Sequence, residues 1–353
     1  MRRTTFITAA AISLVSIAVL SGCSSTGDAG AAASPAKELR LGYFANLTHA
    51  PALIGLDKGL FADALGDTRI TTQLFSAGPA AIEALSAGAL DAAFIGPSPA
   101  INSYIKSKGQ SLVVVAGAAT GGAALVVRNG ITTAADLKGT TLASPQLGNT
   151  QDVALRSWLA DKGYKTSTTG GGDVTITPTE NADTLKLFAA GKLDGAWLPE
   201  PWVSRLVVEG GAHVLVDEAS LWPDGAFPTT VLVVNKSFLA AHPQAVSELV
   251  TGEVAAVTWL NDNPSDAAAA INDKLTADTG KGLDPKVIER ALGTIAFSPD
   301  PQAQTFPTLI AHAVSAGTGT DGDISGLFDL SLLNAVLKAK GATTVSAHGL
   351  GKQ

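Results

Sequence analysis

Cysteine, charge and aromatic residues are all scarce in this chain of 353 residues. Cys23 is the only cysteine, so no disulfide can form within the chain. Charged residues make up 16% of the sequence and aromatic residues 5%, beside 37 glycines, which excludes a disordered chain and favours an α/β protein packed with small residues. The formal net charge of −7 argues against nucleic acid as a partner. The length is sufficient for two domains with a sizeable core.

Sequence signatures of catalysis are missing as well. There is no GxSxG motif, no Walker loop and no cluster of carboxylates. The histidines are scattered without the spacing of metal ligands: they are His49, His213, His242, His312 and His348. We therefore expect a protein that is not an enzyme and that uses neither a metal nor a cofactor.

The first residues carry an export signal. Arg2 and Arg3 precede an apolar run of 15 residues, which is short of the roughly 20 that cross a bilayer as a helix. The run ends in Leu20-Ser21-Gly22-Cys23, which resembles a bacterial lipobox. We expect a signal peptide over residues 1–22, a lipid on Cys23, a flexible tether over residues 23–37, and a place on the extracytoplasmic face of the cell membrane. An ordinary signal peptide with an incidental cysteine is the alternative, and the paired arginines leave Sec and twin-arginine export both open.

The sequence contains an internal repeat of one stretch. LKLFAAGKLDGAWLPEPW (185–202) repeats IEALSAGALDAAFIGPSP (82–99) at an offset of 103 residues, which aligns Asp194 with Asp91. Each copy predicts a helix, a closing glycine in the left-handed conformation, and a buried parallel strand that stops at prolines. Ligands of open α/β sheets bind beyond the carboxyl ends of strands, so residues 96–98 and 199–202 are predicted to be two binding loops, one per lobe. Chance similarity between two helix–strand units is the alternative.

Hydrophobic periodicity places further elements along the chain. Strands are expected at 39–43, 70–74, 112–116, 140–143, 174–177, 214–216 and 229–235, and helices at 50–58, 134–139, 152–162, 236–260, 267–275, 285–291 and 331–338. We expect residues 38–126 to form the first part of lobe 1, 127–228 to form lobe 2, and 229–353 to cross back and return to lobe 1. Hinges are expected near 126–128 and 229–231, where the chain passes between lobes.

The order of several segments resembles a known family. LRLGYFAN, then FSAGPAAIEALSAGALDAAFIGPSPA, then DLKGTTLASPQLGNTQDVALRSWL, then AAGKLDGAWLPEPW are similar to solute-binding proteins of nitrate/sulfonate/taurine-type ABC importers, over about residues 38–240. The resemblance implies the α/β, two-lobed type II periplasmic-binding-protein fold, with a ligand cleft between the lobes. It also implies a monomer that delivers a small organic anion or zwitterion, such as an aliphatic sulfonate or taurine, to permease and ATPase subunits. The alternatives are a same-fold enzyme or binding protein of thiamine-pyrimidine or riboflavin metabolism, and a sensory solute-binding lipoprotein.

The family's ligand loops fall on particular residues of this chain. These are Phe44, Asn46, Ser76, Gly78, Pro97, Ser98, Gly148, Asn149, Thr150, Glu200 and Trp202. Many members have a serine–histidine pair where this chain has Asn149 and Thr150, which leaves the ligand class open.

Two of these loops open helices, whose free N–H groups suit a sulfonate, phosphonate or carboxylate. Ser76 and Asn149 or Thr150 are also expected to cap those helices. None of the loops contains a lysine or arginine, so we expect Glu200 to accept a hydrogen bond from an ammonium or polar tail of the ligand. A solvated carboxylate at the rim is the alternative for Glu200.

Overall fold

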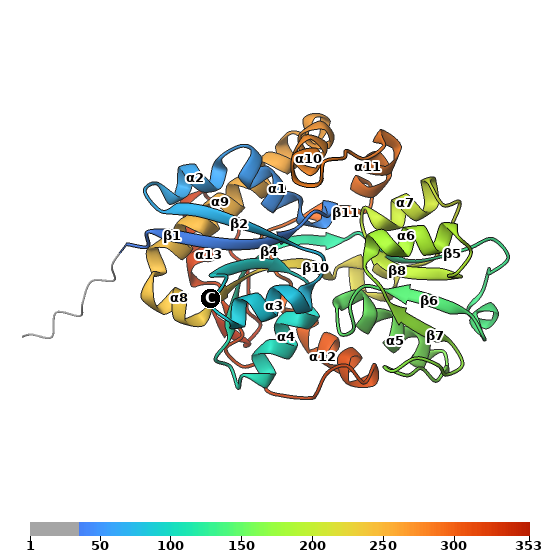
Figure 1. The fold of residues 1–353 in the computed structure, drawn as a ribbon. Coiled ribbons are helices and arrows are strands. Elements are labelled where there is room, and N and C mark those ends of the chain that lie inside the picture. The colour runs from blue at the N-terminus through green and yellow to red at the C-terminus, as the bar shows by residue number, and fades with distance from the viewer. Residues whose placement is uncertain (1–34) are drawn as a thin grey trace, which may run out of the picture. The chain divides into compact units, whose positions relative to one another are not determined.

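A computed structural model describes residues 35–353 of the protein (Figure 1). Cys23, the expected signal peptide and most of the expected tether lie outside the described residues. In the described part of the chain, no helix is both long and apolar enough to cross a membrane.

The described residues form two β-sheets with helices on both faces of each (Figure 1). The first sheet has the order β13-β12-β4-β10-β3-β1-β2, with β11 paired to β4, and the second has the order β7-β6-β8-β5-β9. The strands of the first sheet are β1 (Glu38–Phe44), β2 (Arg69–Phe75), β3 (Ala92–Ile95), β4 (Leu112–Gly121), β10 (Pro228–Asn235), β11 (Ile295–Phe297), β12 (Phe328–Asp329) and β13 (Gly351–Lys352). Those of the second are β5 (Ala123–Val127), β6 (Thr141–Ser144), β7 (Thr175–Pro178), β8 (Gly195–Pro199) and β9 (His213–Asp217).

Both sheets are mixed in strand direction. β1 lies parallel to β2 and β3, whereas β10 runs antiparallel to β3 and β4. In the second sheet β6 lies parallel to β7 and β8, and β5 runs antiparallel to β8 and β9. We call the first sheet with its helices lobe 1 and the second sheet with its helices lobe 2. The predicted α/β class with two lobes is confirmed.

The helices cover the sheets in layers (Figure 1). One face of the lobe 1 sheet is covered by α1 (Ala50–Asp57), α2 (Leu60–Leu65), α9 (Pro243–Asp262), α10 (Pro264–Thr279) and α13 (Ser331–Ala339). The other face is covered by α3 (Gly78–Ser86), α4 (Pro97–Lys106) and α12 (Phe306–Ser315). The short helix α8 (Lys236–Ala241) follows β10. Around lobe 2, α6 (Asn181–Ala189) and α7 (Trp202–Val208) lie on one face and α5 (Thr150–Asp161) on the other, while α11 (Pro285–Leu292) packs against α7. Short 3-10 turns are η1 (Leu47–His49), η2 (Ala134–Leu137), η3 (Glu218–Leu221), η4 (Pro223–Gly225) and η5 (Ala303–Thr305).

Alternation along the strands of lobe 2 divides its core in two. Leu125 and Trp197 belong to the apolar cluster on the α5 side, where the Trp197 and Trp158 rings meet edge to face at 6.0 Å. Val126 and Leu198, one residue further along each strand, belong to the cluster beneath α6 and α7. Successive side chains of a strand point to opposite faces, so each strand contributes to both clusters.

The repeated stretch forms the same unit in both lobes. Its first copy runs from α3 through Gly88 into β3, and its second from α6 through Gly191 into β8. Both glycines have φ = +71°, the left-handed conformation expected at the end of these helices.

The two aligned aspartates make equivalent contacts. The Asp91 carboxylate accepts a hydrogen bond from the backbone N–H of Arg40 in β1 (2.9 Å), and the Asp194 carboxylate accepts one from that of Thr141 in β6 (2.8 Å). Each carboxylate also pairs with an arginine: Asp91 with Arg40 at 2.5 Å, and Asp194 with Arg128 at 3.1 Å. In both lobes an aspartate thus holds the start of the repeat's strand against its parallel neighbour.

The chain changes sheet earlier than we expected. β4 and β5 are separated only by Gly122, and Val126 already pairs with Ala196 inside lobe 2. The passage between sheets therefore lies at Gly121-Gly122, and the expected boundary at residue 126 falls within a paired strand. The return passage precedes Pro228, where β10 begins.

The C-terminal segment touches both lobes. α12 packs against α4 in lobe 1 and α5 in lobe 2, and α11 packs against α10 and α7. Contacts of this kind join the two sheets into one compact unit.

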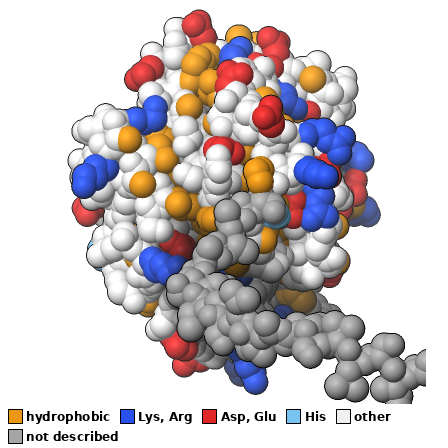
Figure 2. All heavy atoms as spheres, turned by 90° about the vertical axis from the view of Figure 1, so that its left-hand side faces the viewer, with side chains coloured by type: hydrophobic (Ala, Val, Ile, Leu, Met, Phe, Trp, Pro, Cys, Tyr) orange, Lys and Arg blue, Asp and Glu red, His pale blue; other side chains and the backbone are white. Residues whose placement is uncertain are grey.

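The face of lobe 1 shown in Figure 2 carries acidic and basic side chains side by side, with small groups of hydrophobic side chains between them. The part of this face that grey atoms do not cover shows no broad field of positive charge of the kind that binds a nucleic-acid backbone.

Glu253 is an unpaired acid in the core of lobe 1. It lies in α9 with 0% of its surface exposed, and neither carboxylate oxygen has a hydrogen-bond partner among the described residues. Burial raises the pKa of Glu253 well above its ordinary 4.5. The folded chain therefore keeps this proton at pH values where the unfolded chain loses it.

We predict that Glu253→Gln removes a pH dependence of stability. Above pH 4.5 the folded wild type binds more protons than the unfolded chain, so its free energy of unfolding falls as pH rises. Urea denaturation should show similar stabilities at pH 4.5 and a growing advantage for the variant up to pH 7.5, by about 1.4 kcal/mol per pH unit until the folded pKa is passed. Glu248→Gln, on the same helix but partly exposed, is the control; a pH-independent gap for Glu253→Gln would contradict the prediction.

Candidate functional site

A small cavity lies where the carboxyl ends of strands from both lobes meet. Its lining comes from the ends of β1 and β8, the start of β10, the loops after β2 and β3, and the starts of α5 and α6. The lining residues are Phe44, Asn46, Thr48, His49, Ser76, Gly96, Asn149, Gln151, Asn181, Pro199 and Thr229. Its volume is about 10 Å³, which is room for about one water molecule.

The structure brings most of the predicted site residues to this cavity or its wall. Phe44, Asn46, Ser76 and Asn149 line it directly. Gly78 and Trp202 lie against the lining residues Asn149 and Asn46, and Pro97, Gly148 and Thr150 are neighbours of lining residues in the chain. Ser98 bonds to Thr150, and the Gly148 N–H donates to the Asp152 carboxylate at 2.9 Å. Glu200 is the exception.

Several of these residues bond to each other across the cleft between the lobes. The hydrogen bonds are Ser98 N–H to Thr150 Oγ1 (3.4 Å), Trp202 Nε1–H to Asn46 Oδ1 (2.9 Å) and Ser76 Oγ–H to Glu180 Oε1 (3.1 Å). In each pair one partner comes from lobe 1 and the other from lobe 2. These contacts hold the two lobes together at the cavity.

Two glycines allow the lobes to approach this closely. A β-carbon on Gly96 would overlap Thr150 Oγ1, and one on Gly78 would lie 2.5 Å from Pro99 Cγ and 3.1 Å from Asn149 Oδ1. Neither glycine has a positive φ, so the requirement is for space and not for backbone conformation.

Three helices begin at the cavity without a side-chain cap. The N-cap residues of α3, α4 and α5 are Ala77, Gly96 and Asn149, and none of their side chains accepts a hydrogen bond from the first turn. Of the expected caps, Asn149 does occupy the N-cap position of α5, although its side chain makes no capping bond, and Thr150 is the first helical residue. The expected cap at Ser76 is wrong, because Ser76 precedes the N-cap of α3 and bonds to Glu180 instead.

Uncapped first turns offer a partial positive charge to an anion, and N–H donors where these are free. The free donors belong mainly to α5, because Pro79, Pro97 and Pro99 have no N–H and the Ser98 N–H already donates to Thr150 Oγ1.

The start of α5 is fixed by a buried ion pair. Asp152 accepts hydrogen bonds from Ser144 Oγ (2.6 Å), Gly148 N–H (2.9 Å) and Arg156 Nε (3.0 Å), and both charged side chains have 0% exposure. Arg156 neutralises the carboxylate, which would otherwise oppose the positive end of this helix.

His49 is a lining residue that we did not predict. Its Nδ1 accepts a hydrogen bond from the Phe44 N–H (3.3 Å), and its ring stacks on that of Phe44 at 4.3 Å. Burial lowers the pKa of His49 to about 3, so the imidazole is neutral at ordinary pH and its hydrogen resides on Nε2. The site thus gains a neutral donor and no positive charge.

Other lining residues were also missed, and two polar atoms at the site lack partners. Thr48, Gln151, Asn181 and Thr229 were not among the predicted binding residues, whereas Gly96 and Pro199 lie in the two predicted binding loops. Asn181 Oδ1 and Ser98 Oγ are buried with no hydrogen-bond partner among residues 35–353. Asn181 follows the strand at 175–178, so the strand-end rule applied to that strand would have found it.

Glu200 points away from the cavity, contrary to our expectation. Only 1% of it is exposed, and its carboxylate accepts from Ser204 N–H (2.9 Å), Ser204 Oγ–H (2.8 Å) and Arg290 Nη1 (3.2 Å). The first of these bonds satisfies a free N–H in the first turn of α7, which is why the side chain folds back on the chain. Burial raises the pKa of Glu200, although Ser204 and Arg290 act in the other direction. These internal bonds occupy the oxygens that we expected to receive a ligand's ammonium.

The lining carries no formal charge at neutral pH among the described residues. In the same part of the chain, no group of three His, Cys, Asp or Glu side chains could hold a metal ion. What the cavity offers is helix N-termini, hydroxyls, amides and one neutral imidazole.

Comparison with known proteins relates this arrangement to a family of binding proteins. Residues 32–273 match the protein family described as the NMT1-like family. One relative, from Bacillus subtilis (strain 168), is provisionally named as an aliphatic sulfonates-binding protein. It is 30% identical to this chain over 280 residues, which are 78% of this chain and 79% of the relative. The taurine-binding periplasmic protein of Escherichia coli (strain K12) is 27% identical over 217 residues, 61% of this chain and 64% of that protein.

Solved structures share the fold. The alkanesulfonate-binding protein SsuA from Xanthomonas axonopodis pv. citri, solved with MOPS bound, matches with a TM-score of 0.68 at 23% identity, over 82% of this chain and 96% of that one. The predicted periplasmic-binding-protein fold and the resemblance to this group of proteins are thereby confirmed. On the family match and the Bacillus subtilis relative together, the chain belongs to the NMT1-like family.

Proposed function

We propose that this protein is the extracytoplasmic solute-binding subunit of an ABC importer, and that it captures an aliphatic sulfonate or a taurine-like zwitterion between its two lobes. The observation that carries the proposal is the meeting of three uncapped helix starts, those of α3, α4 and α5, at a cavity without charged side chains. The names of the sulfonate- and taurine-binding relatives support the same ligand class.

The chemistry of the lining suits a sulfonate. Its three oxygens accept hydrogen bonds, and a helix start supplies N–H donors and a partial positive charge without a basic side chain. His49 Nε2 and the unpartnered Ser98 Oγ are further donors at or beside the cavity. An ammonium group on the same ligand would donate to Asn181 Oδ1, a buried acceptor of the lining that has no donor among the described residues. This assigns to Asn181 the part that we first gave to Glu200.

Binding then requires the lobes to part and close again. A cavity of about 10 Å³ holds no sulfonate, so entry breaks the contacts across the cleft, and the solute's oxygens take the place of some of them. The backbone change would fall at Gly121-Gly122 and before Pro228, where the chain passes between sheets. The loaded protein, a monomer tethered by a lipid on Cys23, would deliver the solute to permease and ATPase subunits.

We predict that Asn149→Asp abolishes or strongly weakens sulfonate binding while the fold remains intact. Asn149 is only 6% exposed and its side chain makes no capping bond, so the new carboxylate should also cost stability, on the order of 1–3 kcal/mol, and circular dichroism checks that the fold remains. The new carboxylate would repel the anion at the start of α5 and weaken binding at least tenfold, about 1.4 kcal/mol. Isothermal titration calorimetry with taurine and ethanesulfonate measures the effect.

Asn235→Asp is the matched control. It makes the same change at the N-cap of α8. The Asn235 N–H bonds to the Asp91 carbonyl at the amino end of β3, whereas the cavity lies at the carboxyl end of that strand. Its sulfonate affinity should equal that of the wild type. If Asn149→Asp also binds sulfonates as tightly as the wild type, the anion does not bind at the start of α5.

We predict that Cys23→Ala releases the protein from the membrane. Loss of the acceptor cysteine prevents lipid attachment, and the processed protein should then fractionate with soluble or secreted proteins. Membrane fractionation with mass spectrometry of the mature N-terminus tests this. A variant that remains membrane-bound with the wild-type mass would refute the lipid anchor.

A further inference from the structure

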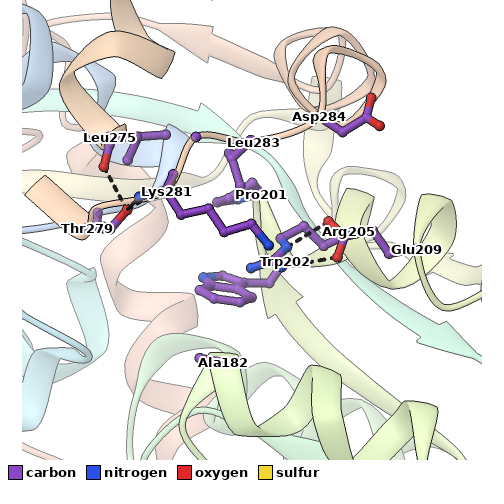
Figure 3. A pocket seen from close by; sticks show the side chains of 12 residues that line it. Ala182, Pro201, Trp202, Arg205, Glu209, Leu275, Thr279, Lys281, Leu283 and Asp284 are labelled. Carbon is purple, nitrogen blue, oxygen red and sulfur yellow. Dashed lines mark hydrogen bonds and ion pairs between the residues drawn. The ribbon is translucent and has the colours of Figure 1, made fainter. Parts of the chain in front are cut away.

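A much larger hollow, whose lining side chains are shown in Figure 3, lies beside the cleft cavity. Its volume is about 530 Å³, and it lies between α7 of lobe 2 and the segment that links α10 to α11. Pro201, Trp202, Leu275 and Leu283 supply apolar lining. We call this hollow the outer groove.

The outer groove and the cleft cavity share one wall. Ala45 lines the groove and Asn46 the cavity, and the same relation holds for Ala182 and Asn181. The wall is closed by the hydrogen bond from Trp202 Nε1 to Asn46 Oδ1 (2.9 Å). If the lobes parted and this bond broke, the two spaces would join.

Among residues 35–353, one cation of the groove lining has no ion-pair partner. Arg205 is paired with Glu209 through two hydrogen bonds, of 2.9 and 3.0 Å, and its guanidinium lies over the Trp202 ring at 4.9 Å. The side chain of Lys281 extends across the groove towards Trp202 and Arg205 (Figure 3), and no ion pair to its ammonium occurs among the described residues.

The remaining charged side chain of the lining is already engaged. Asp284 caps α11 by accepting from the Lys286 N–H at 2.8 Å, and it points away from the groove (Figure 3). An apolar hollow with a single unpaired ammonium is suited to the body of an organic ligand that ends in an anionic group.

We propose that the outer groove is a second subsite of the solute site, and that the preferred solute is a dianionic organosulfonate. This inference rests on the proposed function. The sulfonate binds in the cleft at the helix starts, the apolar body passes the position of the Asn46–Trp202 bond and lies along Trp202 and Leu283, and a distal carboxylate pairs with Lys281. The cleft cavity alone determines the head group, and the groove determines which sulfonate is chosen.

The test compares two ligands that differ only in the distal carboxylate: 4-sulfobenzoate and benzenesulfonate. Isothermal titration calorimetry on the wild type should give about fivefold tighter binding of 4-sulfobenzoate, the upper end for an exposed ion pair. Lys281→Gln should erase this preference and leave the Kd of benzenesulfonate unchanged. Lys286→Gln, which removes the same charge a few residues away and outside the groove lining, should retain the preference.

The possible failures point to different errors. Any one of three results would show that the groove is not a ligand subsite while leaving the proposed function in place. In the first, the wild type binds taurine or ethanesulfonate but does not prefer 4-sulfobenzoate. In the others, Lys281→Gln retains the preference, or Lys286→Gln loses it to the same extent as Lys281→Gln. If no sulfonate binds at all, the proposed function and this inference are both overturned.

Discussion

The contact on which the site depends most is the bond between an aspartate and the backbone of the neighbouring strand, made once in each lobe. Asp91 holds β3 beside β1, and Asp194 holds β8 beside β6. A hydrogen bond to a charged group contributes about 1.5–3 kcal/mol, and in both cases an arginine partner strengthens it. Because each aspartate lies at the amino end of its strand, it fixes where the carboxyl end lies. The loops that line the cavity follow from those ends.

The two lobes are thus two versions of one unit facing each other, but they do not contribute equally. In lobe 1 the strand of the repeat leads through Gly96 directly into α4, whose uncapped start faces the cleft. In lobe 2 the strand of the repeat leads through Pro199 into a turn, where the Glu200 carboxylate accepts a hydrogen bond from a free N–H in the first turn of α7. Lobe 2 presents the start of α5 instead, fixed by the buried pair of Asp152 and Arg156. The repeat explains the symmetry of the framework, and the local hydrogen bonds explain why the site is not symmetric.

Much of this organisation follows from sequence patterns that report local geometry. A helix, a left-handed glycine and an apolar strand are all short-range features, so both repeat copies and most of the strands could be predicted. The helix at 97–106 was missed because prolines at 97 and 99 suggest a loop, although proline is tolerated in a helix's first turn. The expected helix over 236–260 is divided into α8 and α9 between Ala241 and Pro243.

The directions of individual side chains could not be predicted in the same way. The Glu200 carboxylate accepts hydrogen bonds from the backbone N–H of Ser204, four residues later in the chain, and from the side chain of Arg290, 90 residues later. No periodicity in the sequence indicates these partners. His49 came to line the cavity because its ring stacks on Phe44, a contact that depends on the turn between β1 and α1. Such choices are settled by which polar groups would otherwise be buried without a partner.

The bonds across the cleft set a threshold for selectivity. Each ordinary hydrogen bond contributes about 0.5–1.5 kcal/mol, and the exposed bond between Ser76 and Glu180 contributes least. Opening all three contacts therefore lowers the apparent affinity of any solute by roughly one to three powers of ten. A small ion that replaces only one of them recovers little of that loss, whereas a molecule with several oxygens recovers most of it. On the proposed function, the protein's own side chains would thus compete with simple anions for the site, and that discrimination would need no pocket shaped to exclude them.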